Sequence, residues 1–536
     1  MEYTFASTCF NSSVIYRIFP KSFFDSDGDG IGDLKGIISK LPYFVSLGID
    51  TLALSSFLET DSDGALFSVT DFCRVNPALG TADDFDELVN KAHKCGLKIF
   101  LSFPISATST SHPWFEKSKS ASTLNPYREY YVWNNGRGKN PPDNRKTRFK
   151  TSFWGFEAKS KEWFRCFYNE KYPELNYDNP RVRKEIVDVF RFWRQKQVDG
   201  FMIENLAFST EKMLLRDQKT VYTVNEELFD EGKSVFRVLR DVKEKLQEEF
   251  PIILCTESVD LGLFPYLLQK QKPIADSLAD CSLLCGTDLI ARSSFSLKEF
   301  VKNYLTMQDS ACAPTMILSF EDKDHSRLVS ELAKVTDETH PFAAKFLCVL
   351  LFCAPMTPSV YQGEEIGMSN YVFSKNDART GIDPALFHAR SPFQWDNNPN
   401  AAFTDNEVSY FPANGNYHKI NLLTQADNQN SVFSFYRKMI AFRKASSALS
   451  LGKFTDYSQG SFVCFVRSSD SERLLVIANA SPKHQNAQTP ATLLGESAVC
   501  EICNYPIVSK TLNRTMGLRP YEVRIFRLKA PLLALN

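Results

Sequence analysis

A short apolar stretch that ends on a carboxylate constrains the fold of this chain most strongly. Residues 198–203 read Val-Asp-Gly-Phe-Met-Ile and are followed directly by Glu204. A short run of this kind predicts a buried strand. In barrels built from alternating strands and helices, the groups that perform chemistry lie at the C-terminal ends of the strands. We therefore expect Glu204 to lie at a functional site.

Similar runs alternate with helical patterns along most of the chain. Strands are expected at residues 14–19, 48–54, 97–103, 251–257, 314–320 and from 356, and helices at residues 34–47, 83–95 and 179–195. Strands that alternate with helices are typical of a parallel sheet. From residue 452 onward, alternating runs such as 462–466 and 474–477 predict an antiparallel β-sandwich.

Composition excludes several classes of partner. The chain has 536 residues, too many for one hydrophobic core. Its net charge of −1 gives no overall field that favours nucleic acid.

No apolar stretch reaches the ~18 residues of a membrane span, and the N-terminus lacks the pattern of a signal peptide. A cytoplasmic protein is the default expectation, and a missing leader would make it a secreted protein or an ectodomain.

An acidic loop near the N-terminus predicts a metal site. Asp25, Asp27 and Asp29 alternate, and Asp33 follows, with glycines between them. Clustered carboxylate oxygens on a tight turn suit Ca²⁺. An EF-hand would need Glu at the twelfth loop position, which is Gly36 here. The alternative is an acidic turn without metal, but clustered carboxylates repel one another unless a cation neutralises them. We expect a structural Ca²⁺ ion.

Several segments together resemble motifs of the α-amylase family, glycoside hydrolase family 13. They are the strand before Glu204, Tyr-Pro-Glu-Leu-Asn at 172–176, the stretch 356–367, and Arg-Ser-Pro-Phe-Gln-Trp-Asp at 390–396. The acidic loop is similar to that of the oligo-1,6-glucosidase branch. This similarity implies that the calcium is held by Asp25, Asp27, Asp29, Asp33 and the carbonyl of Ile31.

The resemblance implies an α/β fold, a (β/α)₈ TIM barrel with an inserted small domain after its third strand and a C-terminal antiparallel β-sandwich. The expected boundaries are 1–103 and 173–451 for the two parts of the barrel domain, 104–172 for the loop-rich insert and 452–536 for the sandwich. These boundaries follow the matched motifs in chain order.

The resemblance also assigns a site. Retaining glycosidases use one carboxylate as nucleophile and a second carboxyl group as general acid. By position, Glu204 is the nucleophile, Glu257 the general acid and Asp324 the third carboxylate of the family, and Arg390 binds substrate.

The chain departs from the family at most of the other site positions. Met202 replaces an Arg and Glu204 an Asp, while Lys323 replaces a His. Further replacements are Ser102, Ser106 and Ala107 for Asp, Asn and His, and Phe67-Ser68 for Tyr-Asp. The extra methylene of Glu204 adds about 1.5 Å, whereas displacements of about 1 Å can cost on the order of 100-fold in rate. An apolar neighbour in place of a cation also favours the protonated, unreactive carboxyl.

Three functions remain open at this point. The first is an impaired or inactive α-glucosidase-like protein with a binding or structural role, whose partner is a carbohydrate, a less polar small molecule or a protein. The second is an active retaining α-glucosidase of altered specificity that uses Glu204 and Glu257. The third rests on a further resemblance, to the heavy-subunit ectodomains of heteromeric amino-acid transporters, and implies a protein partner.

Overall fold

The computed structural model describes most of the chain. The described residues are 12–55, 57–61, 68–120, 122, 124–144, 151–166, 169–204, 237–246, 253–257, 281–285, 301–302, 304–305, 316–332, 335–373, 384–494, 497–506 and 511–529. Within this part of the chain, no helix is both long and apolar enough to cross a membrane.

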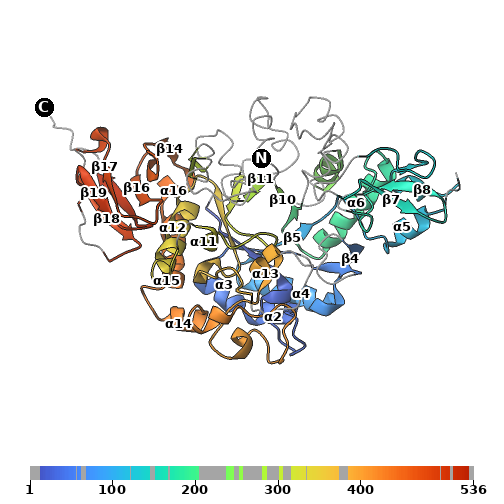
Figure 1. The fold of residues 1–536 in the computed structure, drawn as a ribbon, viewed down its shortest axis with the longest axis horizontal. Helices are drawn as coiled ribbons and strands as arrows, with labels where there is room; N and C mark the ends of the chain where they lie inside the picture. Colours follow the sequence, from blue (N-terminus) through green and yellow to red (C-terminus); the bar gives the residue numbers. More distant parts are fainter. Residues whose placement is uncertain are drawn as a thin grey trace. The chain divides into compact units, whose positions relative to one another are not determined.

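Eight strands form the closed barrel that the family resemblance implies. They are β1 (Ile15–Ile18), β2 (Thr51–Leu54), β5 (Lys98–Phe103), β9 (Gly200–Ile203), β10 (Ile253–Glu257), β11 (Cys281–Cys285), β12 (Met316–Ser319) and β13 (Thr357–Tyr361). Their order around the barrel is β1-β13-β12-β11-β10-β9-β5-β2, and β5, β10 and β11 are labelled among them in Figure 1. Pairing is parallel between β1 and β13, β12 and β13, β9 and β10, and β5 and β9. The TIM-barrel prediction is confirmed.

The chain divides into two compact units. Unit 1 contains residues 1–52, 95–97 and 283–536, and unit 2 contains residues 53–94 and 98–282. Unit 2 holds α4 (Ala82–Lys94), β5, α6 (Pro180–Gln195), β9 and β10. It also holds a two-stranded sheet of β3 (Leu58–Thr60) and β4 (Val69–Val75), and a three-stranded sheet, order β6-β8-β7, formed by β6 (Trp133–Asn134), β7 (Trp154–Glu157) and β8 (Glu162–Arg165).

Helix α6 shows how the sequence sets the local structure of unit 2. Its N-cap residue, Asn179, accepts a hydrogen bond from the backbone N–H of Arg181, and Pro180 occupies the first helical position. The buried side chains recur at helical spacing and end with Trp193. The indole N–H of Trp193 donates to the carbonyl of Phe72 at 2.8 Å, which satisfies its polar atom in the core.

One predicted helix is divided in the structure. The sequence pattern predicts a single helix over residues 34–47, whereas the chain forms α2 (Leu34–Ser39) and α3 (Leu41–Leu47) with a break at Lys40. The ring of Pro42 cannot continue the hydrogen-bond ladder of a preceding helix, so it starts a new one. Helix α3 then ends at Gly48, whose φ of 88° is the left-handed conformation typical of helix ends.

Unit 1 joins its part of the barrel to a cluster of helices. These are α11 (Leu328–Glu331), α12 (His340–Cys353), α13 (Pro384–Arg390), α14 (Leu422–Ala426), α15 (Val432–Ala445) and α16 (Ser447–Leu451). Helix α12 is buried almost all round, as its apolar sequence predicts. Two buried guanidiniums, Arg443 and Arg467, donate to backbone carbonyls at and just beyond the C-terminal end of this helix.

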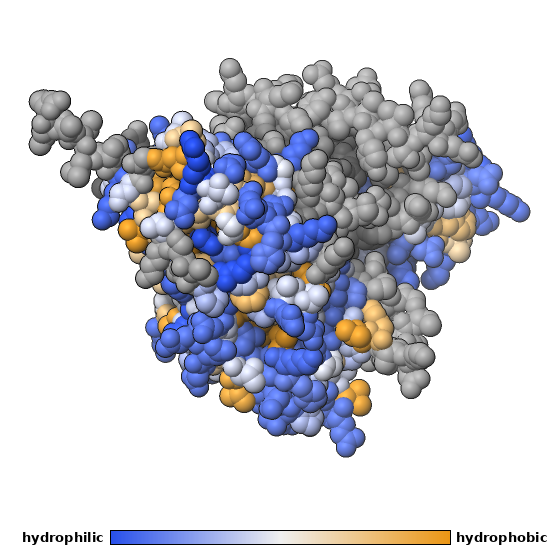
Figure 2. Space-filling view, turned by 60° about the vertical axis from the view of Figure 1, so that its left-hand side comes forward, coloured by the Kyte–Doolittle hydropathy of each residue, from blue (hydrophilic) through white to orange (hydrophobic). Residues whose placement is uncertain are grey.

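The C-terminal strands form the predicted sandwich. One sheet has the order β14-β15-β16-β20-β18 and the other pairs β17 with β19. Their bounds are β14 (Lys453–Asp456), β15 (Phe462–Ser468), β16 (Arg473–Asn479), β17 (Gln485–Gln488), β18 (Ser497–Cys503), β19 (Thr515–Leu518) and β20 (Val523–Lys529). Side chains of both sheets, such as Phe526 and Met516, share one buried core. On the face drawn in Figure 2, hydrophilic residues dominate the described surface and hydrophobic ones form small separate groups.

Candidate functional site

Unit 2 places Glu204 directly after β9. Its backbone N–H donates to the carbonyl of Phe103 at 3.0 Å, which continues the parallel pairing beyond Ile203. The side chain of Glu204 is buried. Pairing of β10 with β9 brings Thr256 beside Ile203, so Glu204 and Glu257 follow paired positions on neighbouring strands. The side chain of Glu257 lies outside the described part of the structure.

The residues around Glu204 differ from the family motif in polarity. Met202 is fully buried on β9, and its strand partners are Ser102 on β5 and Cys255 on β10. A buried thioether contributes no charge to a carboxylate two residues away, whereas the family's Arg would favour the ionised form. Met202 therefore gives Glu204 an apolar neighbour two residues earlier in the chain, as the sequence predicts.

The segment after β5 also lacks the family's side chains. Ser106 and Ala107 are both buried. Backbone hydrogen bonds fix this segment, because Leu175 N–H donates to the carbonyl of Ser106 and Thr108 N–H donates to that of Pro173, each at 3.1 Å. Ser68 is buried as well, and Phe67 lies outside the described residues. At these positions a small hydroxyl or a methyl group stands where the family has larger hydrogen-bonding side chains.

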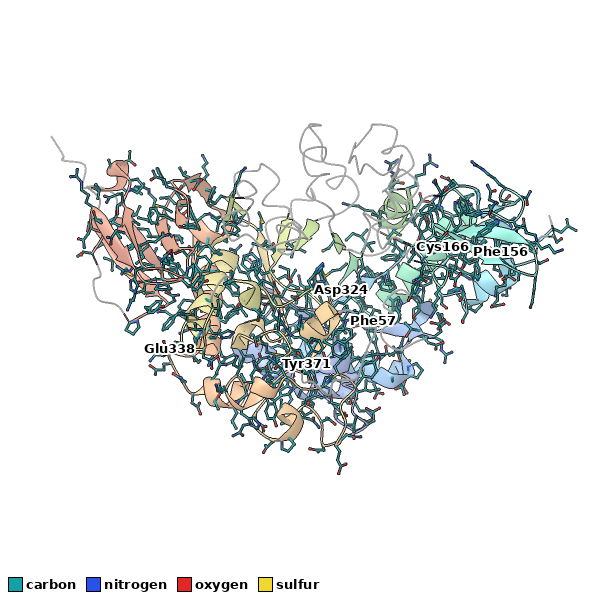
Figure 3. The ribbon with its side chains drawn as sticks, in the orientation of Figure 1. Phe57, Phe156, Cys166, Asp324, Glu338 and Tyr371 are labelled. Carbon is teal, nitrogen blue, oxygen red and sulfur yellow. The ribbon has the colours of Figure 1, made fainter. Side chains whose placement is uncertain are left out.

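Unit 1 brings Asp324 and Arg390 together. Asp324, which is labelled in Figure 3, lies in the loop after β12. Arg390 is the last residue of α13. Arg390 Nη2 lies 2.8 Å from Asp324 Oδ1, and Lys323 Nζ lies 2.9 Å from Asp324 Oδ2. Each oxygen of the carboxylate therefore has a cation against it. Arg390 Nε also donates to the carbonyl of Lys323 at 2.9 Å, which ties the loop to α13.

These cations set the charge of Asp324. Burial by itself would raise the pKa of this carboxyl, but the charges of Lys323 and then Arg390 hold it below its usual value. The side chain of Lys323 is only 2% exposed, so its ammonium is held inside the protein. Asp322 supports the same loop by accepting hydrogen bonds from the backbone N–H of Asp324 at 2.7 Å and from His325 Nδ1 at 2.8 Å.

The acidic loop forms a separate candidate metal centre in unit 1. One carboxylate oxygen from each of Asp25, Asp27 and Asp29 lies within 4.8 Å of the others. Asp33 has a different place. Its carboxylate accepts from the backbone N–H groups of Ser26 at 2.7 Å and Gly36 at 2.6 Å, and it is the N-cap of α2.

Electrostatics in the loop agree with a place for a cation. Burial, and then the charges of its acidic neighbours, raise the pKa of Asp29. Asp25 behaves differently, because hydrogen bonds from Thr404 and the loop backbone outweigh its burial and lower its pKa. A bound divalent ion would relieve the repulsion among these carboxylates. Three oxygen donors on a tight turn fit Ca²⁺ chemically.

Two contributors to the acidic loop could not be found from the sequence. Thr404 donates its hydroxyl to Asp25, and Asn406 Nδ2 donates to the carbonyl of Gly28 at 2.8 Å. Both residues are more than 370 positions away in the chain. Their types are common in turns, and nothing in the local sequence marks them as partners of the loop.

Comparison with known proteins agrees with this geometry. The family model described as "Alpha amylase, catalytic domain" matches residues 17–452. The oligo-1,6-glucosidase of Bacillus cereus is 30% identical over 559 residues, covering 96% of this chain and 99% of that protein. The amino acid transporter heavy chain SLC3A1 of Mus musculus is 30% identical over 463 residues, covering 82% of this chain and 65% of that protein.

A solved structure has the same fold over almost the whole chain. A variant of the isomaltulose synthase of Erwinia rhapontici NX5, in complex with its natural substrate sucrose, superposes with a TM-score of 0.86 at 27% identity. The match covers 97% of this chain and 99% of that one. With the barrel, the matched catalytic-domain model and a full-length relative at 30% identity, the chain belongs to the α-amylase family, glycoside hydrolase family 13.

Proposed function

We propose that this chain is an α-glucosidase-like member of the family in which hydrolysis is lost or severely impaired, and that it acts by binding a ligand or a partner. The observation that carries this proposal is the state of Asp324. Its two carboxylate oxygens lie against Lys323 and Arg390. Each oxygen of this carboxylate already faces a cation, so fewer of its acceptor sites remain for the hydroxyls of a sugar.

The nucleophile position supports the same proposal. Glu204 is one methylene longer than the family's Asp, and Met202 supplies no positive charge to keep it ionised. Catalytic groups must be held within about 0.5 Å of the productive position. If each lost hydrogen bond to substrate costs about 1.5–3 kcal/mol, the combined replacements reduce the rate by roughly 10⁴-fold or more.

The test is a gain of function. The variant Met202→Arg/Glu204→Asp/Lys323→His restores the family's residue types at three positions and should hydrolyse maltose, sucrose or an aryl α-glucoside faster than the unmodified chain. Adding Glu257→Gln to the same variant should abolish the gain, because the general acid is then removed. High activity of the unmodified chain that the three replacements do not increase would contradict the proposal.

The second candidate is an active retaining α-glucosidase of altered specificity. It is favoured by the parallel pairing that places Glu204 and Glu257 after adjacent residues of β9 and β10. Retaining enzymes need two carboxyl groups about 5–5.5 Å apart, and tips of neighbouring strands can supply such a pair. A covalent glycosyl adduct on Glu204, found by mass spectrometry after incubation with a slow substrate, would establish this candidate.

A third candidate is a role as partner of an amino-acid transporter. It is favoured by the 30% identity to the mouse transporter heavy chain over 82% of this chain. The test is co-purification of a transporter light subunit with the full chain from cells that express both. A chain that stays unassociated under conditions where a heavy chain forms its complex would argue against this role.

We also propose that the acidic loop binds a structural calcium ion. Asp25, Asp27 and Asp29 would hold it, with the Ile31 carbonyl and Asp33 as the further ligands that the family resemblance implies. The bound ion would attract the carboxylates of the turn and neutralise their negative charge. Since Asp33 already caps α2, it would have to share its oxygens between the helix and the metal.

A further inference from the structure

A cluster of buried carboxyl groups in unit 1 has no part in the proposed function. Glu321 follows β12, and Glu364 and Glu365 follow β13 in a short 3₁₀ turn. Their exposed fractions are 2%, 6% and 0%. The guanidinium of Arg327, which is itself fully buried, acts on all three acids. Within the described residues, these acids therefore share the positive charge of Arg327.

Arg327 forms its ion pair with only one of these acids. Its Nη1 lies 2.9 Å from Glu321 Oε2 and also donates to the carbonyl of Gln362 at 2.8 Å. Its Nε donates to the carbonyl of His388 at 3.2 Å. The backbone N–H of Leu328 donates to the other oxygen of Glu321 at 2.9 Å. Burial raises the pKa of Glu321, but the charge of Arg327 and these hydrogen bonds oppose the shift, so Glu321 is the acid of the three that is best compensated as an anion.

The other two acids receive neutral donors. Glu364 accepts from the backbone N–H of Tyr361 at 3.0 Å and lies 3.4 Å from the hydroxyl of Tyr436. Glu365 accepts from the hydroxyls of Tyr16 and Tyr43, both at its Oε1. Within the described residues, Glu365 Oε2 has no hydrogen-bond partner. A second buried anion without a cation of its own is costly, and such a group takes up a proton instead.

We propose that the folded protein binds a proton in this cluster, with Glu364 as its main site, and that unfolding releases it at neutral pH. Glu364 is the best site because it faces both other acids. Burial, and then the charge of Glu321, raise the pKa of Glu364 well above its ordinary value. Burial also raises the pKa of Glu365, to about 6, although the hydroxyls of Tyr16 and Tyr43 oppose the shift.

The groups that face Glu364 come from several elements. They are Glu321 after β12, Arg327 before α11, Tyr361 of β13, the neighbouring Glu365, Cys348 of α12 and Tyr436 of α15. Burial raises the pKa values of Tyr361, Cys348 and Tyr436, so these groups stay neutral. Arg327 is the single cation in the set, and its charge is shared with Glu321.

The proton makes stability depend on pH in a definite direction. A carboxyl group whose pKa is higher in the folded than in the unfolded protein stabilises the fold fully below the unfolded value, which is about 4.3 for Glu. This contribution is lost as the pH rises through the folded value. While the folded protein holds one extra proton, the unfolding equilibrium constant rises up to tenfold for each pH unit.

The experiment compares Glu364→Gln with Glu338→Gln across pH 5 to 9 by denaturant unfolding. Gln is a neutral isostere of the protonated acid and has no proton to release. The unfolding equilibrium constant of Glu364→Gln should therefore rise less steeply with pH than that of the unmodified chain, by up to tenfold for each pH unit. Glu338 is exposed on unit 1 (Figure 3), and its replacement should leave the dependence unchanged. Identical pH dependences for the unmodified chain and Glu364→Gln would overturn the proposal.

An infrared measurement on the unmodified protein covers the case in which Glu364→Gln does not fold. Protonated and ionised carboxyl groups have separate C=O stretching bands. The native protein at pH 7.5 should show a protonated carboxyl band that disappears on unfolding. Absence of that band from the native spectrum would overturn the proposal without any variant.

Discussion

The ammonium of Lys323 lies 2.9 Å from Oδ2 of Asp324, the carboxylate next to it in the chain. The family's residue at the position of Lys323 is a His, which can be neutral and can hydrogen-bond a sugar. The side chain of Lys323 is instead 2% exposed and forms an internal ion pair with Asp324. This pair, together with Arg390, fixes the carboxylate of Asp324 in the loop after β12 between two cations.

Lys323→His should give the protein measurable affinity for a glucoside. The replacement removes one cation from Asp324 and leaves an oxygen able to accept a sugar hydroxyl. We expect maltose binding at least tenfold tighter than in the unmodified chain, about 1.4 kcal/mol, measured by titration calorimetry. Lys419→His, at an exposed ion pair with Asp337, is the matched control. Equal affinities in all three proteins would argue against a role of Lys323 in limiting sugar binding.

Lys323→Met should change stability in a pH-dependent way. Because the pKa of Asp324 is lowered in the folded protein, its ionisation stabilises the fold above about pH 3.9, and this contribution is lost as the pH falls through the folded value. Without Lys323 the variant should be less stable at pH 7 by about 1–3 kcal/mol. The difference should shrink below pH 4. A constant difference from pH 7 to pH 3 would contradict this account of the pair.

Calcium should stabilise the acidic loop. Adding Ca²⁺ to chelator-treated protein should raise the unfolding temperature, since an ion bound only to the folded state stabilises it by about 2.7 kcal/mol at 100 times its Kd. Asp29→Asn should abolish the rise, because Asp29 belongs to the group of three close carboxylates. Asp337→Asn, an exposed Asp of the same unit, should respond as the unmodified chain does. If Ca²⁺ still raises the unfolding temperature of Asp29→Asn, the ion binds at a different site.

Arg443→Met should destabilise the packing of α12 against α15. The Arg443 guanidinium donates to the carbonyls of Phe352, Ala354 and Met356 at 2.7–2.8 Å. Leaving three buried carbonyls without donors costs about 1–3 kcal/mol for each one, so a loss of at least about 3 kcal/mol is expected in denaturant unfolding. Arg437→Met, on the exposed side of the same helix, should change stability by less than about 0.5 kcal/mol.

The barrel was predictable because its strands carry continuous apolar runs that end abruptly. Six of the predicted strands begin and end within three residues of the structure's bounds, and β13 lies inside the stretch predicted from residue 356. Strand β11 was missed. Its sequence, Cys-Ser-Leu-Leu-Cys, is short and has no distinctive motif. The division between α2 and α3 was also missed, because the apolar spacing continues past Pro42 and outweighed the backbone rule in the prediction.

The candidate site was predictable where neighbours in the chain make the contacts. Lys323 and Asp324 are neighbours in the chain, and the structure joins them in an ion pair. The contact of Arg390 with Asp324 joins residues 66 positions apart, and only the family resemblance assigned both residues to one site. The buried acids Glu364 and Glu365 read as part of a family motif, and only their burial indicates that they bind a proton.

The most direct measurement is the release of aryl alcohol from an aryl α-glucoside by the purified full chain, beside Glu257→Gln. Our account predicts that the two proteins release it at the same rate, no faster than background. Turnover by the unmodified chain at about 1–10³ s⁻¹, as in ordinary enzymes, and its loss in Glu257→Gln would contradict the central claim.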